Sequence, residues 1–506
     1  MKEGNVRFGD RILAEGTTYL YSQPIRFHGY TDRDVTDGSP TYQAIANRLR
    51  AAIRRGDLAP GARMPSVRRL AENEQVSAPT AEHALRVLEA SGLVVARPRS
   101  GFYVAADKPA EPLPPQPGAT ARPVTLTANV HALFAQVRSP DLVALGAASP
   151  CAAWLPDKAL ARSMLGATRR LGASGLAYSV PPGRLDLRRQ IARRAARWGL
   201  HISPDQLVLT QGQSQAMRLA LQVTCKEGDV VAVESPCYFG TLMLLRSLGL
   251  RAIEVPTHPR TGMDLAALAQ ILHRHRVSAV VSVPTANNPL GFTMSIAAKR
   301  TLVKLLDDAG VPLIEDDVYG DLSAGKPRAP ACKAFDESGN VLYCTSVSKT
   351  VAPGWRVGWI APGHRFDAVL EARVEASLAG SPLFEAALAD MFSSGDYDRH
   401  LRRYGQRIKD SVRTFSSRIA ATWPAGTKLR APDDGFLLWV ELPACVNALS
   451  LCEAAASEGI SIGPGAMFCP DGSRYAHHVR INCAQPPTPK LLAALDRIGA
   501  LAAAQG

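Results

Sequence analysis

The stretch SVSKTVAPGWRVGW, residues 346–359, follows an apolar run and carries one lysine, Lys349. A lysine amine can form an imine with a carbonyl compound, and nearby cations raise its reactivity by lowering its pKa. Ser346 and Ser348 offer hydroxyls and Arg356 a guanidinium, which suit a phosphate dianion. A lysine between small polar residues is also common in surface loops, so the surrounding sequence decides between the two interpretations.

Short apolar segments alternate with amphipathic helices on both sides of this stretch, from about residue 126 onward. We predict strands at 206–210, 230–234, 279–284, 312–316 and 341–345. Apolar strands separated by helices are typical of parallel βαβ units, in which helices cover both faces of the sheet. The predicted fold class of this part is therefore α/β.

Polar residues follow several of these strands, at the edge where open α/β sheets bind ligands. Asp316 ends one strand, and its carboxylate is suited to a pyridine nitrogen, whereas the adjacent Asp317 is better suited to capping a helix. Tyr319 can donate a hydrogen bond to a phenolic oxygen on the ring of the same ligand. Asn288 can donate to the same oxygen, or it can simply occupy the turn before Pro-Leu-Gly.

Two further groups complete what pyridoxal 5′-phosphate (PLP) requires. PLP needs a lysine, an acid for its ring nitrogen, an aromatic ring for stacking and donors for its phosphate. Gln213 and Ser214 lie where a strand meets the start of a helix, and backbone N–H groups there bind anions. Tyr238 is the candidate for stacking, with Phe239 as the alternative. These residues together point to a PLP site around Lys349.

The order and spacing of these motifs resemble fold-type I aminotransferases over residues 126–506. The motifs are T-x-G-x-x-x-A, E-x-P-x-Y, N-N-P-x-G, D-D-x-Y, S-x-S-K-x-x-x-P-G-x-R-x-G and a late V-R-[IL]-[NS]. The resemblance implies Lys349 for the Schiff base, Asp316 for the ring nitrogen, Tyr238 for stacking, Asn288 and Tyr319 for the phenolic oxygen, and Gln213, Ser214, Ser346, Ser348 and Arg356 for the phosphate. It also implies that Tyr178, in Y-x-x-x-x-G, reaches the phosphate bound by the partner subunit. Arg480 matches the arginine that clamps a substrate carboxylate, a bidentate task.

Residues 41–106 have a different pattern, which predicts three helices and a hairpin. Apolar residues recur with helical spacing from Tyr42 to Ile53, and Gly56 should end that helix. The other expected boundaries are Ser66 as an N-cap, Ser77 or Thr80 at the start of a third helix, Ser91-Gly92 at its end, and hairpin strands at 93–96 and 101–104.

Three helices and a hairpin describe a winged helix-turn-helix, whose third helix enters the major groove while basic residues grip phosphates. Residues 41–106 hold ten Arg against five acidic residues, a charge that favours an anionic partner. Any single arginine here can also be an ordinary solvated charge. The candidate contacts to double-stranded DNA are Arg63, Ser66, Arg68, Arg69, Ser77, Thr80, Arg97, Arg99 and Gly101.

The same segment resembles the N-terminal domain of GntR-family transcription regulators. It carries G-x-L-x-P-G-x-x-[LM]-P-S-x-R-x-L-A, then V-S-x-x-T, then L-x-x-x-G. The family often has Arg directly after V-S, whereas here Ala78 and Pro79 follow Ser77. The base preference of relatives therefore does not carry over with the fold.

Residues 108–123 contain six prolines and behave as a semi-rigid spacer. We predict an N-terminal arm at 1–40, a winged helix-turn-helix at 41–106, a Pro-rich linker at 107–125 and an aminotransferase-like effector domain at 126–506. This combination resembles the MocR subfamily of GntR regulators.

The MocR resemblance implies a PLP-dependent transcriptional regulator. An amino acid or amine, or PLP itself, would be sensed at Lys349. The free-energy difference between the ligand-bound states would then bias how the two DNA-binding domains of a head-to-tail homodimer are placed. The rival interpretation is a working aminotransferase (transaminase), since Lys349, Asp316 and Arg480 are all present. A third is that the chain responds to PLP as a regulator of vitamin B6 synthesis or salvage.

The remaining composition predicts a cytoplasmic protein. The nine cysteines are scattered without a CxxC pair, which indicates reduced thiols and no metal or disulfide framework. The N-terminus lacks the apolar core of a signal peptide, and no apolar run approaches the ~20 residues that a membrane span needs.

Overall fold

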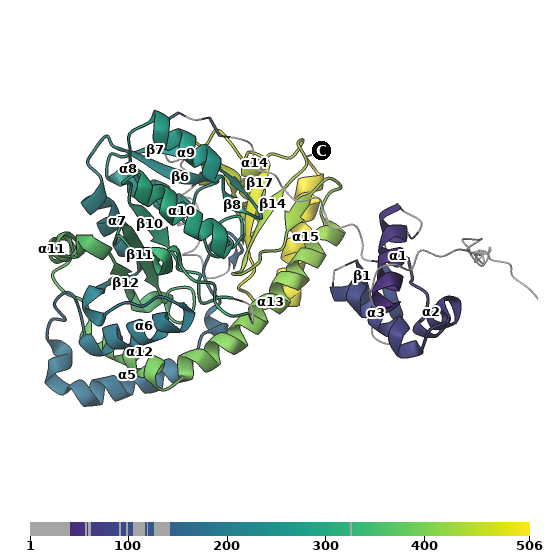
Figure 1. Ribbon diagram of the computed structural model, residues 1–506, viewed down its shortest axis with the longest axis horizontal. Coiled ribbons are helices and arrows are strands. Elements are labelled where there is room, and N and C mark those ends of the chain that lie inside the picture. Colours follow the sequence, from purple (N-terminus) through teal and green to yellow (C-terminus); the bar gives the residue numbers. More distant parts are fainter. Residues whose placement is uncertain are drawn as a thin grey trace, which may run out of the picture. The chain divides into compact units, whose positions relative to one another are not determined.

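A computed structural model of the chain describes residues 41–55, 58, 62–90, 93–97, 100–104, 117–118, 120–125, 142–323 and 326–505. The chain divides into two compact units, Met1–Asp107 and Lys108–Gly506 (Figure 1). The predicted arm, most of the predicted linker, and the helix ends predicted at Gly56 and Ser91-Gly92 lie outside the described residues.

The first unit has the predicted three helices and a hairpin. Its elements are α1 (Thr41–Arg55), α2 (Val67–Glu74), α3 (Ala78–Ala90), β1 (Val94–Arg97) and β2 (Gly101–Val104). Leu85 and Leu88 are buried in its core, together with Ile45 of α1. The Ser66 hydroxyl accepts from the Arg69 N–H at 3.2 Å, which confirms the predicted cap of α2.

The cap of α3 lies at the first of the two predicted positions. The helix begins at Ala78, and the Ser77 hydroxyl accepts from the Thr80 N–H at 3.3 Å. Thr80 is therefore inside the first turn of the helix.

The second unit is built around a mixed sheet with the strand order β3-β7-β6-β9-β10-β11-β12-β5, and β8 pairs with β7. The strands are β3 (Arg122–Pro123), β5 (Val208–Thr210), β6 (Val230–Ser235), β7 (Arg251–His258), β8 (Gly262–Met263), β9 (Val277–Ser282), β10 (Leu313–Asp316), β11 (Val341–Ser346) and β12 (Gly358–Ala361). Strands β7, β6, β9, β10 and β11 are parallel, as predicted for β6, β9, β10 and β11, whereas β7 was not predicted. Strand β12, which the sequence does not predict, runs antiparallel to both β11 and β5.

Helices cover both faces of this sheet (Figure 1). They are α5 (Asp157–Leu171), α6 (Leu185–Ala195), α7 (Gln213–Thr224), α8 (Phe239–Ser247), α9 (Leu265–Arg274), α10 (Ile296–Asp308), α11 (Phe366–Ala376) and α12 (Pro382–Ser393). Along β6, Val231 and Val233 pack into one apolar cluster and Ala232 into another. The alternation follows from the strand period of two, and it leaves the sheet buried on both sides.

A smaller sheet lies toward the C-terminus, with the order β13-β14-β17-β16. Its strands are β13 (Lys428–Arg430), β14 (Leu437–Glu441), β16 (Gly463–Pro464) and β17 (His478–Asn482); β4 (Val143–Ala144) pairs with β15 (Ile460–Ser461), and the helices are α13 (Asp396–Thr422), α14 (Ala448–Ser457) and α15 (Pro489–Ala503). Strand β17 carries Arg480. Among the helices that the described ranges contain, none has the length and apolar character to cross a membrane.

Candidate cofactor site

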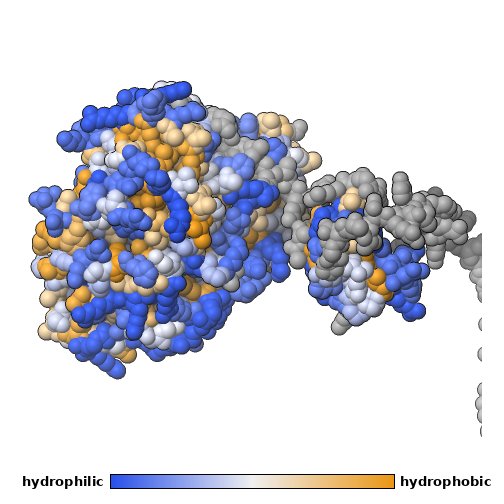
Figure 2. Space-filling model, viewed as in Figure 1, coloured by the Kyte–Doolittle hydropathy of each residue, from blue (hydrophilic) through white to orange (hydrophobic). Residues whose placement is uncertain are grey.

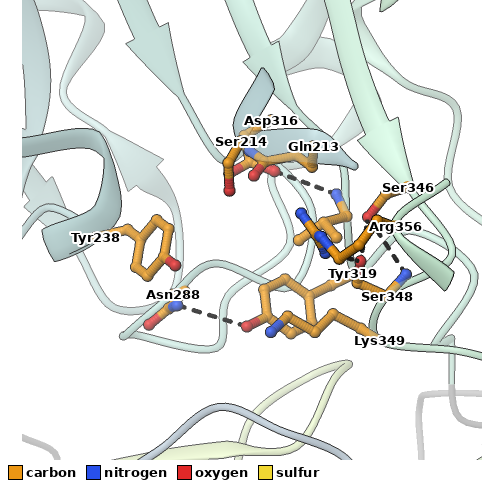
Figure 3. A pocket seen from close by; sticks show the side chains of 11 residues that line it. Gln213, Ser214, Tyr238, Asn288, Asp316, Tyr319, Ser346, Ser348, Lys349 and Arg356 are labelled. Carbon is orange, nitrogen blue, oxygen red and sulfur yellow. Dashed lines mark hydrogen bonds between the residues drawn. The ribbon is translucent and has the colours of Figure 1, made fainter. Parts of the chain in front are cut away.

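One cavity is lined by ten of the residues predicted to bind a cofactor, together with Val318. The ten are Gln213, Ser214, Tyr238, Asn288, Asp316, Tyr319, Ser346, Ser348, Lys349 and Arg356 (Figure 3). They lie at or after the carboxyl ends of β5, β6, β9, β10 and β11, which parallel strands bring to one edge of a sheet. The cavity is partly open to solvent, and polar groups converge on it beside the ring of Tyr238, which suits a small molecule.

The side of the cavity opposite Tyr238 is rich in groups that bind anions (Figure 3). Gln213 and Ser214 form the first turn of α7, where backbone N–H groups are unpaired within the helix. Arg356 Nη1 donates to Ser348 Oγ at 3.2 Å. Gly212 adopts φ 81°, and a Cβ there would collide with the Arg356 guanidinium. A glycine at this position therefore leaves room for the cation beside the helix start.

Two serines continue this polar wall. Ser346 Oγ donates to Ser348 Oγ at 3.0 Å and accepts from the Ser348 N–H at 3.3 Å. Arg356 has a φ of 54°, in the left-handed region that non-glycine residues rarely adopt, and its Nη2 is held by the Gln211 carbonyl at 3.1 Å. The surrounding structure thus fixes an unfavourable backbone to aim this guanidinium.

Lys349 points into the cavity from the loop after β11 (Figure 3). Burial lowers its pKa to about 8, with help from Arg480 and Arg356, while Asp316 opposes the shift. Its Nζ donates to the Ala148 carbonyl at 2.6 Å. The amine is therefore neutral more often than an exposed lysine and is held in a fixed direction.

The two adjacent acids have separate environments. Asp316 is buried, accepts from the Val318 N–H at 3.2 Å, and has its pKa raised to about 7 by burial. Asp317 accepts from Tyr343 Oη at 2.8 Å and pairs with Arg328. The helix-cap interpretation of Asp317 is wrong, because the chain forms a turn here and its carboxylate is used by this buried pair.

Asn288 connects the cavity to Arg480. Its amide nitrogen donates to Tyr319 Oη at 3.5 Å, and its Oδ1 accepts from Arg480 Nη1 at 3.0 Å. Burial raises the pKa of Tyr319, so the hydroxyl stays protonated and can donate. Arg480 is fully buried behind this wall, and its Nη2 donates to the Gly146 carbonyl at 2.5 Å. Its Nε has no hydrogen-bond partner among the described residues.

The structure separates the two aromatic candidates for stacking. Tyr238 is part of the cavity wall. Phe239 is the first residue of α8 and packs edge-on against Phe468, with ring centroids 6.0 Å apart. Of the two rings, only that of Tyr238 faces the space where a ligand would lie.

Glu234 has a supporting role that the sequence analysis missed. It is buried at the end of β6 and accepts from Ser282 Oγ at 2.6 Å, the Val283 N–H at 3.1 Å and Asn287 Nδ2 at 2.8 Å. These bonds fix the loop that presents the next residue, Asn288. The signal was present in the E-x-P-x-Y motif, where an acid follows an apolar strand.

Comparisons with known proteins agree with both parts of the chain. Residues 41–104 match the gntR family of bacterial regulatory proteins, and residues 140–498 match class I and II aminotransferases. The chain is 35% identical to the HTH-type transcriptional regulator YjiR of Escherichia coli strain K12, over 90% of this chain and 98% of that one. It is 36% identical to YdcR of the same strain, over 88% and 95%.

The chain belongs to the MocR subfamily of GntR regulators. It is a GntR-type regulator fused to an aminotransferase-like domain. The second unit is similar in fold to Pyrococcus horikoshii kynurenine aminotransferase, solved with PMP, with a TM-score of 0.69 and 25% identity over 75% of this chain and 95% of that one.

Tyr178 is the predicted cofactor residue of this MocR chain that lies away from the cavity. Its side chain is 76% exposed, and Leu176 and Val180 beside it are also exposed. Within one subunit it therefore contributes nothing to the cavity wall described above.

The predicted DNA contacts lie on the first unit, whose visible face in Figure 2 is largely hydrophilic. Arg63, Arg68 and Arg69 are exposed, and Arg68 Nε donates to Glu72 at 3.1 Å. Gly101 adopts φ 99° and lies beside the Arg63 guanidinium.

The other predicted contacts are serine, threonine and wing residues. The Ser66 and Ser77 hydroxyls cap helices, and Ser77 Oγ lies 2.8 Å from Thr80 Oγ1. The Arg97 side chain and Arg99 lie outside the described residues.

Proposed function

We propose that this MocR regulator binds PLP at Lys349, binds operator DNA through its winged helix, and changes its DNA affinity when PLP or an amino compound occupies the cleft. The observation that carries the proposal is the convergence of ten separately predicted residues on one cavity around the Lys349 amine. The DNA part rests on the GntR match and on the exposed arginines of the first unit.

The cavity fits PLP group by group. The serine and arginine wall beside α7 suits a phosphate, and the space left by Gly212 admits the Arg356 guanidinium. A protonated Tyr319 and the Asn288 amide suit the phenolic oxygen. Asp316 suits a protonated ring nitrogen, since a nearby cation would lower the raised pKa of this buried carboxyl and keep it ionised. When bound, PLP supplies an aldehyde for amines and a ring that withdraws electrons.

The chain's own residues select what joins the cofactor. Lys349 provides an amine with a lowered pKa, and Arg480 provides a buried guanidinium whose Nε is unpartnered among the described residues. The carbonyls of Ala148 and Gly146 occupy these two groups in the structure. A compound that carries both an amine and a carboxylate is the chemical match for the two positions, so we infer an amino acid as the ligand class.

Tyr178 supports a head-to-tail homodimer. An exposed tyrosine between exposed Leu176 and Val180 is an apolar surface that suits an interface. In the proposed dimer, Tyr178 donates its hydroxyl to the phosphate in the partner subunit. Two winged helices would then read two half-sites at a fixed spacing.

Transamination is the second candidate function. Lys349 and Asp316 lie in one cavity, and Arg480 contacts its wall residue Asn288, which is the set that turnover of an amino acid needs. A complete winged helix has no use in a purely metabolic enzyme, so we favour regulation. Multiple turnovers with common amino donors at an ordinary enzymatic rate would favour the enzyme instead.

The test is fluorescence anisotropy of the full-length protein on duplex DNA from upstream of its own gene. PLP and a panel of amino acids are added in turn, with a scrambled duplex and Lys349→Ala as controls. We expect specific binding that shifts with PLP or one amino acid in the wild type, and no amino acid response in Lys349→Ala. Specific binding that no ligand changes would refute the sensor role.

A further inference from the structure

The loop Phe468–Tyr475 contacts two regions that are far apart in the sequence. One is the turn 235–239, which carries the cavity residue Tyr238. The other is the segment 122–125, at the end of the predicted linker. One short loop therefore contacts both the turn that carries the cavity residue Tyr238 and the end of the linker that connects the DNA-binding unit to the second unit. We also call the cavity around Lys349 the cleft.

On the cleft side, the loop holds the Tyr238 turn at two points. The Phe468 carbonyl accepts from the Cys237 N–H at 2.8 Å. Tyr475 Oη lies 2.7 Å from Ser235 Oγ, within hydrogen-bonding distance. Both partners lie within three residues before Tyr238, so a shift of its ring moves the backbone that the loop contacts.

Arg480 provides a second connection to the cleft. Its guanidinium carbon lies 5.0 Å from the centroid of the Phe468 ring, a cation–π contact whose strength depends on how the charge is solvated and paired. A carboxylate at Arg480 would replace the Gly146 carbonyl and neutralise the charge over this ring. The contact between Arg480 and the loop therefore differs between the free and the ligand-bound cleft.

On the linker side, the loop holds a very short strand. Arg122 Nη1 donates to Asp471 Oδ2 at 2.6 Å, and the Thr125 N–H donates to the Pro470 carbonyl at 2.8 Å. Asp471 is fixed in turn by Ser473, whose hydroxyl donates to Oδ1 at 2.6 Å. Strand β3 pairs with β7 over only two residues, and the segment is otherwise held by these loop contacts, by the bond from Arg251 Nη2 to the Ala121 carbonyl at 2.9 Å and by the buried side chain of Val124.

We propose that the loop Phe468–Tyr475 transmits occupancy of the cleft to the linker, and that the Arg122–Asp471 ion pair is the contact through which it does so. The inference rests on the proposed function. The two side chains are 44% and 25% exposed, and a partly exposed pair of this kind changes an equilibrium by up to about fivefold. A contact of that strength is weak enough for a small ligand to make or break it.

The test uses full-length wild type, Arg122→Ala, Asp471→Asn and the double variant. Arg418→Ala is the matched control, because Arg418 pairs with Asp496 at similar exposures of 44% and 33% elsewhere on the same unit. For each protein, the DNA dissociation constant is measured by anisotropy with and without saturating PLP, and PLP binding alone is measured by absorbance. Hydrogen exchange at the Thr125 amide is followed by mass spectrometry as a direct measure of linker attachment.

We expect PLP to change DNA affinity equally in wild type and Arg418→Ala. In Arg122→Ala and Asp471→Asn the change should shrink about threefold or more, with PLP binding intact, Thr125 exchange faster, and no further loss in the double variant. An equal PLP response in all these proteins overturns the loop proposal and leaves the regulator proposal standing. Absence of any PLP or amino acid response in the wild type overturns both.

Discussion

The Lys349 amine should capture PLP with a pH dependence far from that of an ordinary lysine. Its pKa is lowered to about 8 by burial and by the cations of Arg480 and Arg356. At pH 7 a group with this pKa is neutral in about one molecule in ten, whereas at an ordinary value near 10.5 the fraction is about one in three thousand. Because only the neutral amine attacks an aldehyde, the environment of Lys349 raises the reactive fraction about 300-fold.

The assay mixes cofactor-free protein with PLP and follows the absorbance of covalently attached cofactor from pH 6 to pH 10. The same titration on a small lysine peptide corrects for the ionisations of PLP itself, and Lys349→Ala gives the covalent background. We expect the corrected rate to reach half its maximum near pH 8. A midpoint near 10 would show that Lys349 is solvated and would refute the argument from burial.

The variant Arg480→Gln tests how one cation contributes to the pKa of Lys349. Arg480→Gln removes a cation that lowers the pKa of Lys349, so the midpoint should rise and capture at pH 7 should slow. The midpoint should stay below 10.5, because burial is the largest cause and remains. The exposed Arg418→Gln should leave the profile unchanged, and an unchanged profile in Arg480→Gln would mean that Arg480 does not act on the amine.

Three further results follow from the structure. Arg68→Ala should weaken DNA binding and reduce the salt slope by about one, measured by anisotropy over a salt series. The Arg68 side chain is 91% exposed, and its surface pair with Glu72 is weak enough to give way to a phosphate; an unchanged slope would exclude that contact. Tyr178→Phe should weaken PLP binding about tenfold while sedimentation still shows a dimer, because only the hydroxyl bond to the phosphate is lost; unaltered PLP affinity would contradict the shared site. Asp316→Asn should raise the melting temperature of the cofactor-free protein at pH 8 but not near pH 4. The pKa of the Asp316 carboxyl is raised to about 7 in the folded protein, whereas the unfolded chain releases this proton near pH 4. The folded state is therefore destabilised by up to ~4 kcal/mol as the pH rises from about 4 to 7, and Asn removes this cost. Equal melting temperatures of the two proteins at pH 8 would refute the argument.

The convergence of the ten cavity residues was predictable because each of them ends or follows a strand. Parallel strands such as β10 and β11 end at the same edge of the sheet, so Asp316 and Ser346 converge even though no sequence pattern joins them. Strand β7 was missed because Glu254 and Pro256 interrupt its apolar pattern. The sequence gives no reason to place a carboxylate there, but in the fold Glu254 accepts from Ser235 Oγ at 2.8 Å.

Contacts made by backbone carbonyls could not be predicted. Gly146 and Ala148 hold Arg480 and Lys349 through their carbonyl oxygens, and a carbonyl has no side chain that would mark it in the sequence. The Arg122–Asp471 pair joins residues 349 positions apart, so only the assembled fold brings them together. The missed contacts are thus those that hold the segments around the cleft, while the predicted ones form its wall.

This division bears on where a ligand can have an effect. Asp316 ends strand β10, which is paired with a strand on each side. A ligand that binds at the cavity wall therefore cannot easily displace this strand. Strand β3, by contrast, lies at the sheet edge and is paired over two residues; the loop Phe468–Tyr475 adds an ion pair and a backbone hydrogen bond to the segment 122–125, beside the Arg251–Ala121 bond and the burial of Val124. A coupling free energy of 1–3 kcal/mol, typical of allosteric proteins, is too small to rearrange a central strand but large enough to release such an edge. The rigid centre of the sheet therefore serves recognition, and the response of the regulator belongs to its edge.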